Sequence, residues 1–210
     1  IGQFSQRPMV VVVSAMGKMT NAFEEVVAAW SNGNLSEANA KIDAIDTFHQ
    51  SIINELFEDP TEINEHVAAL IASIREGLDK QDISYGEGYD YIVHHGELIS
   101  TRIIAAYVGQ EVPTVWQDTR ELLKTDGQFR RATVQWEQTG LAIRSNIAQD
   151  KVNFVQGFIG SSPDGRPTTL GREGSDYTGA VFAFCLGADS LTIWKDVPGM
   201  LNGDPKTFAN

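Results

Sequence analysis

The chain alternates between unbroken apolar runs and polar loops rich in small residues. The first apolar run, residues 8–13, reads P-M-V-V-V-V and leads into the loop S-A-M-G-K-M-T-N at 14–21. A continuous β-branched run is typical of a strand that is covered on both faces of a sheet. Apolar positions then recur at helical spacing as far as Trp30. This part of the chain predicts a buried strand, a loop and an amphipathic helix.

Two longer segments, 35–59 and 62–78, also carry apolar residues at helical spacing. The positions that define this pattern are Ile42, Ile45, Phe48, Ile52, Ile53, Ile63, Val67, Leu70, Ile71 and Ile74. Pro60 and Thr61 mark the break between the segments, because proline is tolerated at a helix start. We expect a helical sub-lobe over about 35–80, inserted between sheet strands. His49 and His66 lack a partner at metal-ligand spacing, and we expect them to be packing or solvated residues.

The remaining pattern predicts further strands and helices. We expect a flexible connector at 85–89 (Y-G-E-G-Y) and a helix over 90–107. After it we expect three strands, at 112–116, 133–136 and 151–160. We expect a helix at 140–147, between the last two strands. Strands that alternate with helices and are mostly solidly apolar favour a parallel or mixed sheet with helices on both faces. The sequence therefore predicts a single α/β domain.

Composition limits the function. The chain has 210 residues and a net charge of −12. Nucleic acids and anionic membranes both require a basic face, so neither is expected as a partner. The only cysteine, Cys185, excludes a disulfide framework and suits a reducing cytoplasm. No apolar run reaches the length of a membrane span, and no signal peptide is visible. The chain begins at Ile1 rather than Met, so we expect residues to precede it.

Two predicted strand ends carry candidate chemistry. The apolar run from Phe154 leads into the loop G-F-I-G-S-S-P-D-G-R-P-T-T-L-G-R-E-G, and a helix is expected to begin near Ser175. A second apolar run, 191–194, is expected to form a strand that leads into a loop with Lys195, Asp196 and Lys206. Small residues, a helix N-terminus and isolated cations together indicate a site for an anionic ligand.

Other local patterns are less specific. The pair Gly17-Lys18 suggests a phosphate-binding P-loop, but Val12 and Met19 occupy positions where that motif needs Gly and Ser or Thr. A simple strand-to-helix turn is the alternative. His94 and His95 are adjacent on a helix and point about 100° apart, so they make a poor chelate. Asp118 and Arg120 in the turn D-T-R could pair with each other or order the loop.

Several motifs taken together resemble the aspartate kinase family of the amino-acid kinase fold. They are V-V-S-A-M-G-K-M-T-N at 12–21, H-G-E-L-I-S-T at 95–101, D-T-R-E-L-L-K-T-D at 118–126, Q-G-F-I-G at 156–160, T-T-L-G-R-E-G-S-D-Y-T at 168–178, I-W-K-D-V-P-G at 193–199 and D-P-K at 204–206. They occur in the family's order and cover most of the chain outside the helical sub-lobe. The resemblance implies a three-layer αβα sandwich with a mainly parallel central sheet. Residues 1–210 would form part of the catalytic domain, with a nucleotide-side portion at about 175–210.

The resemblance also implies a reaction. The γ-phosphoryl group of ATP would pass to the side-chain carboxylate of L-aspartate, giving 4-phospho-L-aspartate, the first step toward lysine, threonine and methionine. ATP with Mg²⁺ would be a co-substrate, with no bound prosthetic group and no resident metal. A carboxylate with a pKa near 3.9 is already ionised at neutral pH, so no general base is needed. Catalysis should depend on positioning and on neutralising charge.

The family pattern assigns residues to the amino-acid side of this site. Glu97 would bind the substrate ammonium, although a surface glutamate is the alternative, and Gly96 would let a ligand approach the backbone. Arg172 would grip a carboxylate through two parallel N–H bonds, unless it forms a loop salt bridge. Ser175 would add a hydroxyl and a backbone N–H. The other expected substrate contacts are Thr20, Phe158, Gly160, Glu173 and Gly174.

Catalytic and nucleotide-binding roles follow in the same way. Asp176 would orient lysines around the transferred phosphoryl group, or would only cap its helix, and Arg172 would share the catalytic role. Lys195 sits where other members carry a small polar residue, so its backbone could matter more than its charge. The residues expected on the nucleotide side are Ser14, Lys195, Asp196, Leu201 and Lys206.

Two parts of the family pattern are not in this sequence. A strand with the motif K-F-G-G would precede Ile1, and the rest of the kinase domain with paired regulatory domains would follow Asn210. We therefore expect the 210-residue chain alone to be inactive, and the full-length protein to be a homo-oligomer. The sequence leaves two alternatives open: a kinase for another amino acid, such as glutamate or acetylglutamate, and a non-catalytic ligand-binding domain.

Overall fold

The computed structural model describes residues 8–80, 82–171 and 173–195. The elements are, in chain order, β1 (Met9–Val13), α1 (Met19–Ser31), α2 (Leu35–Leu56), α3 (Thr61–Leu78), α4 (Tyr85–Val93), α5 (His95–Gly109), β2 (Thr114–Trp116), α6 (Thr119–Leu122), α7 (Trp136–Asn146), β3 (Val152–Gln156), β4 (Ile159–Ser161), β5 (Pro167–Thr169) and α8 (Gly174–Leu186).

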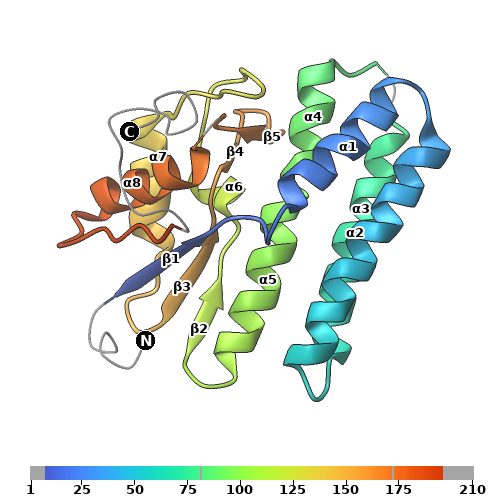
Figure 1. Ribbon diagram of the computed structural model, residues 1–210. Helices are drawn as coiled ribbons and strands as arrows, with labels where there is room; N and C mark the ends of the chain where they lie inside the picture. The colour runs from blue at the N-terminus through green and yellow to red at the C-terminus, as the bar shows by residue number, and fades with distance from the viewer. Residues whose placement is uncertain (1–7, 81, 172, 196–210) are drawn as a thin grey trace, which may run out of the picture.

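The central sheet is parallel and places β3 between β1 and β2. Val11 lies opposite Phe154 in the β1–β3 pair, and Val115 lies opposite Asn153 in the β2–β3 pair. Helix α5 packs against one face of the sheet, and α8, backed by α7, covers the other face (Figure 1). A small antiparallel pair, β4 and β5, extends from the end of β3. The predicted three-layer α/β architecture with a mainly parallel sheet is confirmed.

The helical sub-lobe lies beside the sheet, on the outer side of α5. Helices α1, α2, α3 and α4 pack on one another, and α3 packs against α5 (Figure 1). Their apolar stripes meet in a core that includes Phe23, Ile42 and Ile74, and a second core lies between the sheet and α8 around Val155 and Phe182. The helices expected from periodicity at 35–59 and 62–78 are confirmed as α2 and α3.

The expected connector at 85–89 is wrong, because these residues begin α4. The hydroxyl of Ser84 accepts a hydrogen bond from the backbone N–H of Glu87 at 3.2 Å, which caps this helix. Gly88 faces the ring of Trp30, whose nearest atom would lie 2.2 Å from an added Cβ, so this glycine provides close packing rather than flexibility. The helix expected over 90–107 is also divided, with α4 ending at Val93 and α5 beginning at His95.

Three expected strands also differ. Residues 133–136 contribute one isolated bridge, Thr125 to Val134, and Trp136 already begins α7. The run 151–160 is divided into β3 and β4 because Phe158 has a left-handed backbone, with φ of 70°. Residues 191–194 form no strand. No described strand lies beside them to pair their backbone, and the side chain of Trp194 is 91% exposed.

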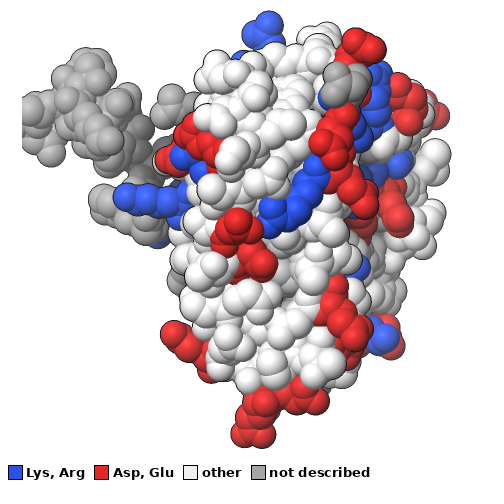
Figure 2. Space-filling model, turned by 90° about the vertical axis from the view of Figure 1, so that its right-hand side faces the viewer, with Lys and Arg blue, Asp and Glu red and all other residues white. Residues whose placement is uncertain are grey.

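The face of the sub-lobe carries mixed charge. Figure 2 shows acidic and basic side chains interspersed over its upper part, with acidic side chains alone toward its lower edge. This face offers no basic patch of the kind that binds nucleic acid. Among the described residues, no helix is long and apolar enough to cross a membrane.

Candidate functional site

A cleft of about 640 Å³ opens where β1, β3, α1, α5 and the start of α8 meet. Nine residues that the sequence assigned to the site line it: Ser14, Thr20, Glu97, Phe158, Glu173, Gly174, Ser175, Asp176 and Lys195. They come from segments that are as far apart as Ser14 and Lys195 in the chain. The cleft lies at the carboxyl ends of parallel strands, where ligands of open α/β sheets bind.

The fold positions the start of α8 against the end of β3. The hydroxyl of Thr178 accepts a hydrogen bond from the backbone N–H of Phe158 at 3.0 Å and donates one to the carbonyl of Gly174 at 2.8 Å. Gly157 makes this contact possible, because an added Cβ would lie 2.5 Å from the Cβ of Ser175. The N-terminal turn of α8, with Gly174, Ser175 and Asp176, therefore lines the cleft.

A buried polar network holds the opposite wall. The side-chain amide of Gln156, at the end of β3, donates to the hydroxyl of Thr101 at 2.8 Å and accepts the backbone N–H of Thr119 at 2.7 Å. Thr101 in turn donates to the carbonyl of Glu97, and the hydroxyl of Ser100 donates to the carbonyl of Ser14 at 2.8 Å. These bonds fix the turn of α5 that carries Glu97 relative to both strands.

Glu97 is a buried acid at the base of the cleft, with 2% of its surface exposed. Oε1 accepts the backbone N–H of Ala15 at 3.4 Å, and Oε2 has no hydrogen-bond partner in the described structure. Burial raises the pKa of Glu97 to about 8, a shift that the bond from Ala15 only partly opposes. The alternative of a surface glutamate is therefore wrong. The expected role of Gly96 is also wrong, because this glycine faces Phe23 and Ala15 rather than the cleft.

Lys195 crosses the mouth of the cleft at the start of α8. Its ammonium lies 2.6 Å from a carboxylate oxygen of Glu173 and 2.7 Å from one of Asp176. These bonds, the one to Asp176 first, raise the pKa of Lys195 above its ordinary value. Asp176 lies in the first turn of α8 and, within the described residues, makes no capping bond to the helix backbone. The geometry brings this acid and a lysine together, as the family pattern suggested.

Six residues of the cleft were not assigned from the sequence: Glu24, Tyr89, Arg130, Thr169, Gly171 and Trp194. Tyr89 was placed in a connector, so its position on a helix facing the site was missed. Arg130 comes from a turn with no family motif, and no sequence signal pointed to it. Thr169 and Gly171 do lie within the quoted T-T-L-G-R motif.

Some expected residues are not in the cleft or cannot be placed. Gly160 lies in β4 and faces Leu123 and Thr125, so it supports the fold rather than the site. The site residues that lie outside the described part of the chain are Arg172, Asp196, Leu201 and Lys206. Among the described residues, no group of three or more His, Cys, Asp or Glu side chains is arranged to hold a metal ion.

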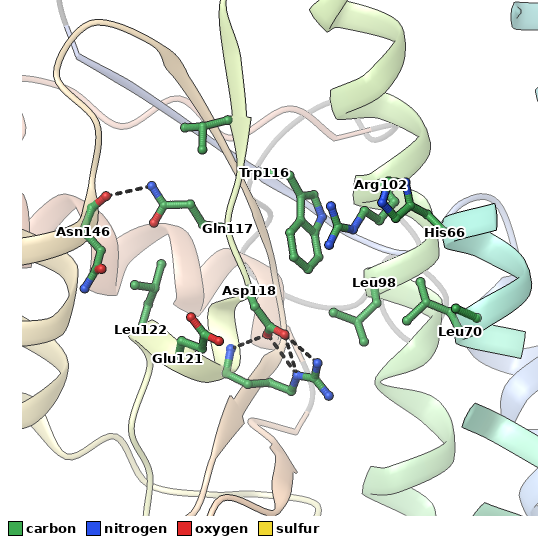
Figure 3. A pocket seen from close by; sticks show the side chains of 13 residues that line it. His66, Leu70, Leu98, Arg102, Trp116, Gln117, Asp118, Glu121, Leu122 and Asn146 are labelled. Atoms are coloured by element: carbon green, nitrogen blue, oxygen red, sulfur yellow. Dashed lines mark hydrogen bonds and ion pairs between the residues drawn. The ribbon is translucent and has the colours of Figure 1, made fainter. Parts of the chain in front are cut away.

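A second cleft, of about 740 Å³, lies along β2, one of the two edge strands of the described three-stranded sheet (Figure 3). Here Asp118 pairs with Arg120, as expected, with Nε of the arginine 2.9 Å from Oδ1. The guanidinium of Arg102 stacks on Trp116 at 3.4 Å from the ring centroid. His66 contributes to the wall. Both charged groups of the Asp118–Arg120 pair are already partnered.

His94 and His95 are buried. Desolvation is the main cause that lowers the pKa of both residues, and it lowers that of His95 to about 3. A neutral His94 with its proton on Nδ1 satisfies both ring contacts, donating to the carbonyl of Asp90 at 3.0 Å and accepting from Arg120 at 3.1 Å. His94 is therefore a structural residue that joins α4 to α6.

The first cleft combines three features: a buried carboxylate with a free oxygen, hydroxyls and N–H groups at a helix start, and a lysine held by two acids. Such a site suits a small zwitterionic ligand beside a phosphate-bearing one. This defines the class, an α/β domain with a cleft lined by charged and polar residues at the ends of its strands.

Comparison with known proteins specifies the family. The model of the amino acid kinase family matches residues 1–210, and the chain belongs to this family. It is 34% identical to lysine-sensitive aspartokinase 3 of Escherichia coli over 95% of its length and 44% of that protein. It is 33% identical to chloroplastic aspartokinase 1 of Arabidopsis thaliana over 98% of its length and 37% of that protein.

A solved structure gives the same result in three dimensions. The fold matches E. coli aspartokinase III in complex with aspartate and ADP with a TM-score of 0.85 and 32% identity, covering 94% of this chain and 44% of that one. The chain thus spans less than half the length of these relatives.

Proposed function

We propose that the protein is an aspartate kinase, which transfers the γ-phosphoryl group of ATP to the side-chain carboxylate of L-aspartate. The relatives that the chain resembles over nearly all of its length are aspartokinases, and one of them binds aspartate and ADP. The observation that carries the proposal is Glu97, a buried carboxylate that lines a cleft at the strand ends and has one oxygen without a hydrogen-bond partner in the described structure. A substrate ammonium would supply the missing partner.

In this reaction an oxygen of the aspartate side chain attacks the γ-phosphorus, and the bond to the bridging β–γ oxygen breaks, releasing ADP. No proton has to leave the nucleophile, because the carboxylate is ionised. The work of the protein is to align two anions and to neutralise the charge between them. Glu97 would anchor the amino group, while Thr20 and Ser175, which line the same cleft, would hydrogen-bond the substrate.

Lys195 and Asp176 would act on the nucleotide side. Lys195 is held at the N-terminus of α8, and a phosphate placed there would gain from both the ammonium and the helix N–H groups. Asp176 would keep the lysine directed toward the phosphoryl group. Ser14 lies at the end of β1 in the same cleft. The proposed contacts of Phe158, Glu173 and Gly174 with the amino acid follow from their place in the lining.

Part of the proposal rests on the family pattern alone. Arg172 would grip a substrate carboxylate and share the catalytic role, and Asp196, Leu201 and Lys206 would contact the nucleotide. Mg²⁺ would arrive with ATP, held mainly by phosphate oxygens and water. We also propose that the full-length protein is a homo-oligomer located in the cytoplasm.

The test is a substrate panel on the intact protein. ADP release is measured with L-aspartate, L-glutamate and N-acetyl-L-glutamate as acceptors, and hydroxylamine trapping detects the acyl phosphate. Activity with aspartate alone is the expected result. Activity with another acid, or aspartate binding without ADP release, would replace the proposal with one of its two alternatives.

A further inference from the structure

Arg130 is a cation of the described cleft wall whose guanidinium forms no ion pair with a described residue. The wall carries four acidic side chains, Glu24, Glu97, Glu173 and Asp176, and the other described cation, Lys195, is already paired with two of them. The described acid that interacts with the charge of Arg130 is Asp90, which accepts its backbone N–H. A substrate with two carboxylates that enters this acidic cleft therefore meets a guanidinium there whose own N–H groups form no ion pair with a described residue.

The guanidinium of Arg130 is held in place by aromatic rings. Its Cζ lies 4.7 Å from the ring centroid of Tyr89 and 5.5 Å from that of Tyr85. The hydroxyl of Tyr89 in turn donates to Glu24 at 2.6 Å. Stacking on a fixed ring orients a guanidinium and leaves its N–H groups available to a carboxylate.

The backbone of Arg130 is held just as firmly. Its φ is 70°, in the left-handed region that non-glycine residues rarely adopt. Its N–H donates to Oδ2 of Asp90 at 2.9 Å, and Asp90 is fully buried. The same carboxylate accepts the N–H of Thr169 at 2.9 Å and its hydroxyl at 2.6 Å. One buried acid on α4 thus positions two residues of the cleft wall.

We propose that Arg130 binds the α-carboxylate of the amino-acid substrate, positioned by Asp90. The inference rests on the proposed function. Arg130 lies on the wall with Tyr89 and Glu24, whereas Lys195 and Asp176 stand at the start of α8. The carboxylate at Arg130 is therefore the one that is not phosphorylated. Arg130 would act beside Arg172, which the family pattern assigns to the same substrate.

The variant Arg130→Gly tests this inference in the intact protein, because glycine adopts a φ of 70° without strain. The matched control is Arg131→Gln, which removes the same charge from the next residue, an exposed one outside the cleft. We expect Arg130→Gly to raise the KM for aspartate at least tenfold, with kcat and the KM for ATP within about twofold. Its thermal unfolding midpoint should stay the same or rise. Arg131→Gln should leave the kinetic constants unchanged, and Arg130→Lys should restore part of the affinity.

The α-amide of aspartate identifies the group that Arg130 contacts. This analogue keeps the side-chain carboxylate and the ammonium but has no α-carboxylate charge. If Arg130 binds the α-carboxylate, the difference between wild type and Arg130→Gly shrinks to near zero with the amide. An equal difference with both compounds, or an unchanged KM for aspartate, overturns the inference. Calorimetry of the wild type separates the two proposals: if it does not bind aspartate, the proposed function fails and this inference with it.

Discussion

Oε1 of Glu97, on α5, accepts the backbone N–H of Ala15, just beyond β1, at a distance of 3.4 Å across 82 residues of sequence. Oε2 has no partner in the described structure, and the side chain is buried. One long hydrogen bond is not enough to stabilise a buried negative charge, so the pKa of this acid rises to about 8. In the absence of a ligand, Glu97 is mostly protonated at neutral pH, and an ammonium beside it would favour ionisation.

Aspartate binding should therefore release a proton from Glu97 near pH 7. The expected stoichiometry approaches one proton per site, because a group with a pKa of about 8 is mostly protonated there and becomes ionised against the ammonium. Calorimetric titrations in buffers of different ionisation enthalpy measure it directly. The affinity for aspartate should rise with pH and level off above about pH 8. A binding enthalpy that is the same in all buffers would contradict the proposed role of Glu97.

Replacing Glu97 with glutamine should weaken aspartate binding at least tenfold and yet stabilise the protein at alkaline pH. The pKa of Glu97 is raised on folding, so its favourable contribution is complete below its unfolded value of 4.5 and is lost as pH rises through about 8. Glutamine has no such dependence. The free energy of unfolding of Glu97→Gln should exceed that of the wild type by about 2–4 kcal/mol at pH 9, after allowance for relaxation around the buried charge.

Urea unfolding at pH 5 and pH 9 checks this expectation, with Glu65→Gln, an exposed position on α3, as the control. The control should show no comparable change between the two pH values. A Glu97→Gln variant that is less stable than the wild type at pH 9 would mean that the ionised carboxylate is stabilised by contacts not seen here.

The sequence predicted the sheet, the long helices and nine residues of the cleft, because these depend on local pattern and on family motifs. It could not predict that Glu97 is buried, since burial depends on how α5 packs against β1 and α1. Arg130 was missed for a similar reason: its place in the cleft depends on a left-handed turn and on a bond to Asp90, 40 residues earlier. The prediction of a strand at 191–194 was wrong because an apolar run does not show whether another strand lies beside it to pair with its backbone.

Asp90 offers a test of how the cleft wall is held. Replacing it with alanine leaves the N–H groups of Arg130 and Thr169 without an acceptor, which should cost about 2–4 kcal/mol of stability. Asparagine can accept both N–H groups and donate to the hydroxyl of Thr169, so Asp90→Asn should stay within about 1 kcal/mol of the wild type. The KM for aspartate should rise in the alanine variant and much less in the asparagine variant. Denaturant unfolding and steady-state kinetics on both variants measure the stability and the KM for aspartate. An equal loss of stability in the two variants would show that the charge of Asp90 matters more than its hydrogen-bond geometry.

Gly157 tests the contact between β3 and α8. An alanine Cβ there would lie 2.5 Å from the Cβ of Ser175 and 2.8 Å from its Cα, so the backbone at the start of α8 would have to move. Gly157→Ala should lose about 1–3 kcal/mol of stability and weaken the binding of both substrates. Gly127→Ala is the matched control, because no heavy atom lies within 4 Å of its added Cβ and its φ is not left-handed. If Gly157→Ala binds aspartate and ATP like the wild type, the start of α8 is not part of the site.

A substitution of Lys195 tests whether the charge of its side chain or the position of its backbone matters for nucleotide binding. Replacing Lys195 with methionine removes the ammonium but keeps an unbranched side chain. The ion pairs of Lys195 with Glu173 and Asp176 are partly exposed, so the free energy of unfolding should change by less than about 1 kcal/mol. If the charge neutralises phosphate, the KM for ATP should rise about tenfold or more, while the KM for aspartate changes little. Lys151→Met, at an exposed position before β3 and outside the cleft, is the control for the loss of one positive charge in an acidic protein. An unchanged KM for ATP in Lys195→Met would leave only the backbone of this residue on the nucleotide side, and would contradict the proposal that Asp176 directs its ammonium toward the phosphoryl group.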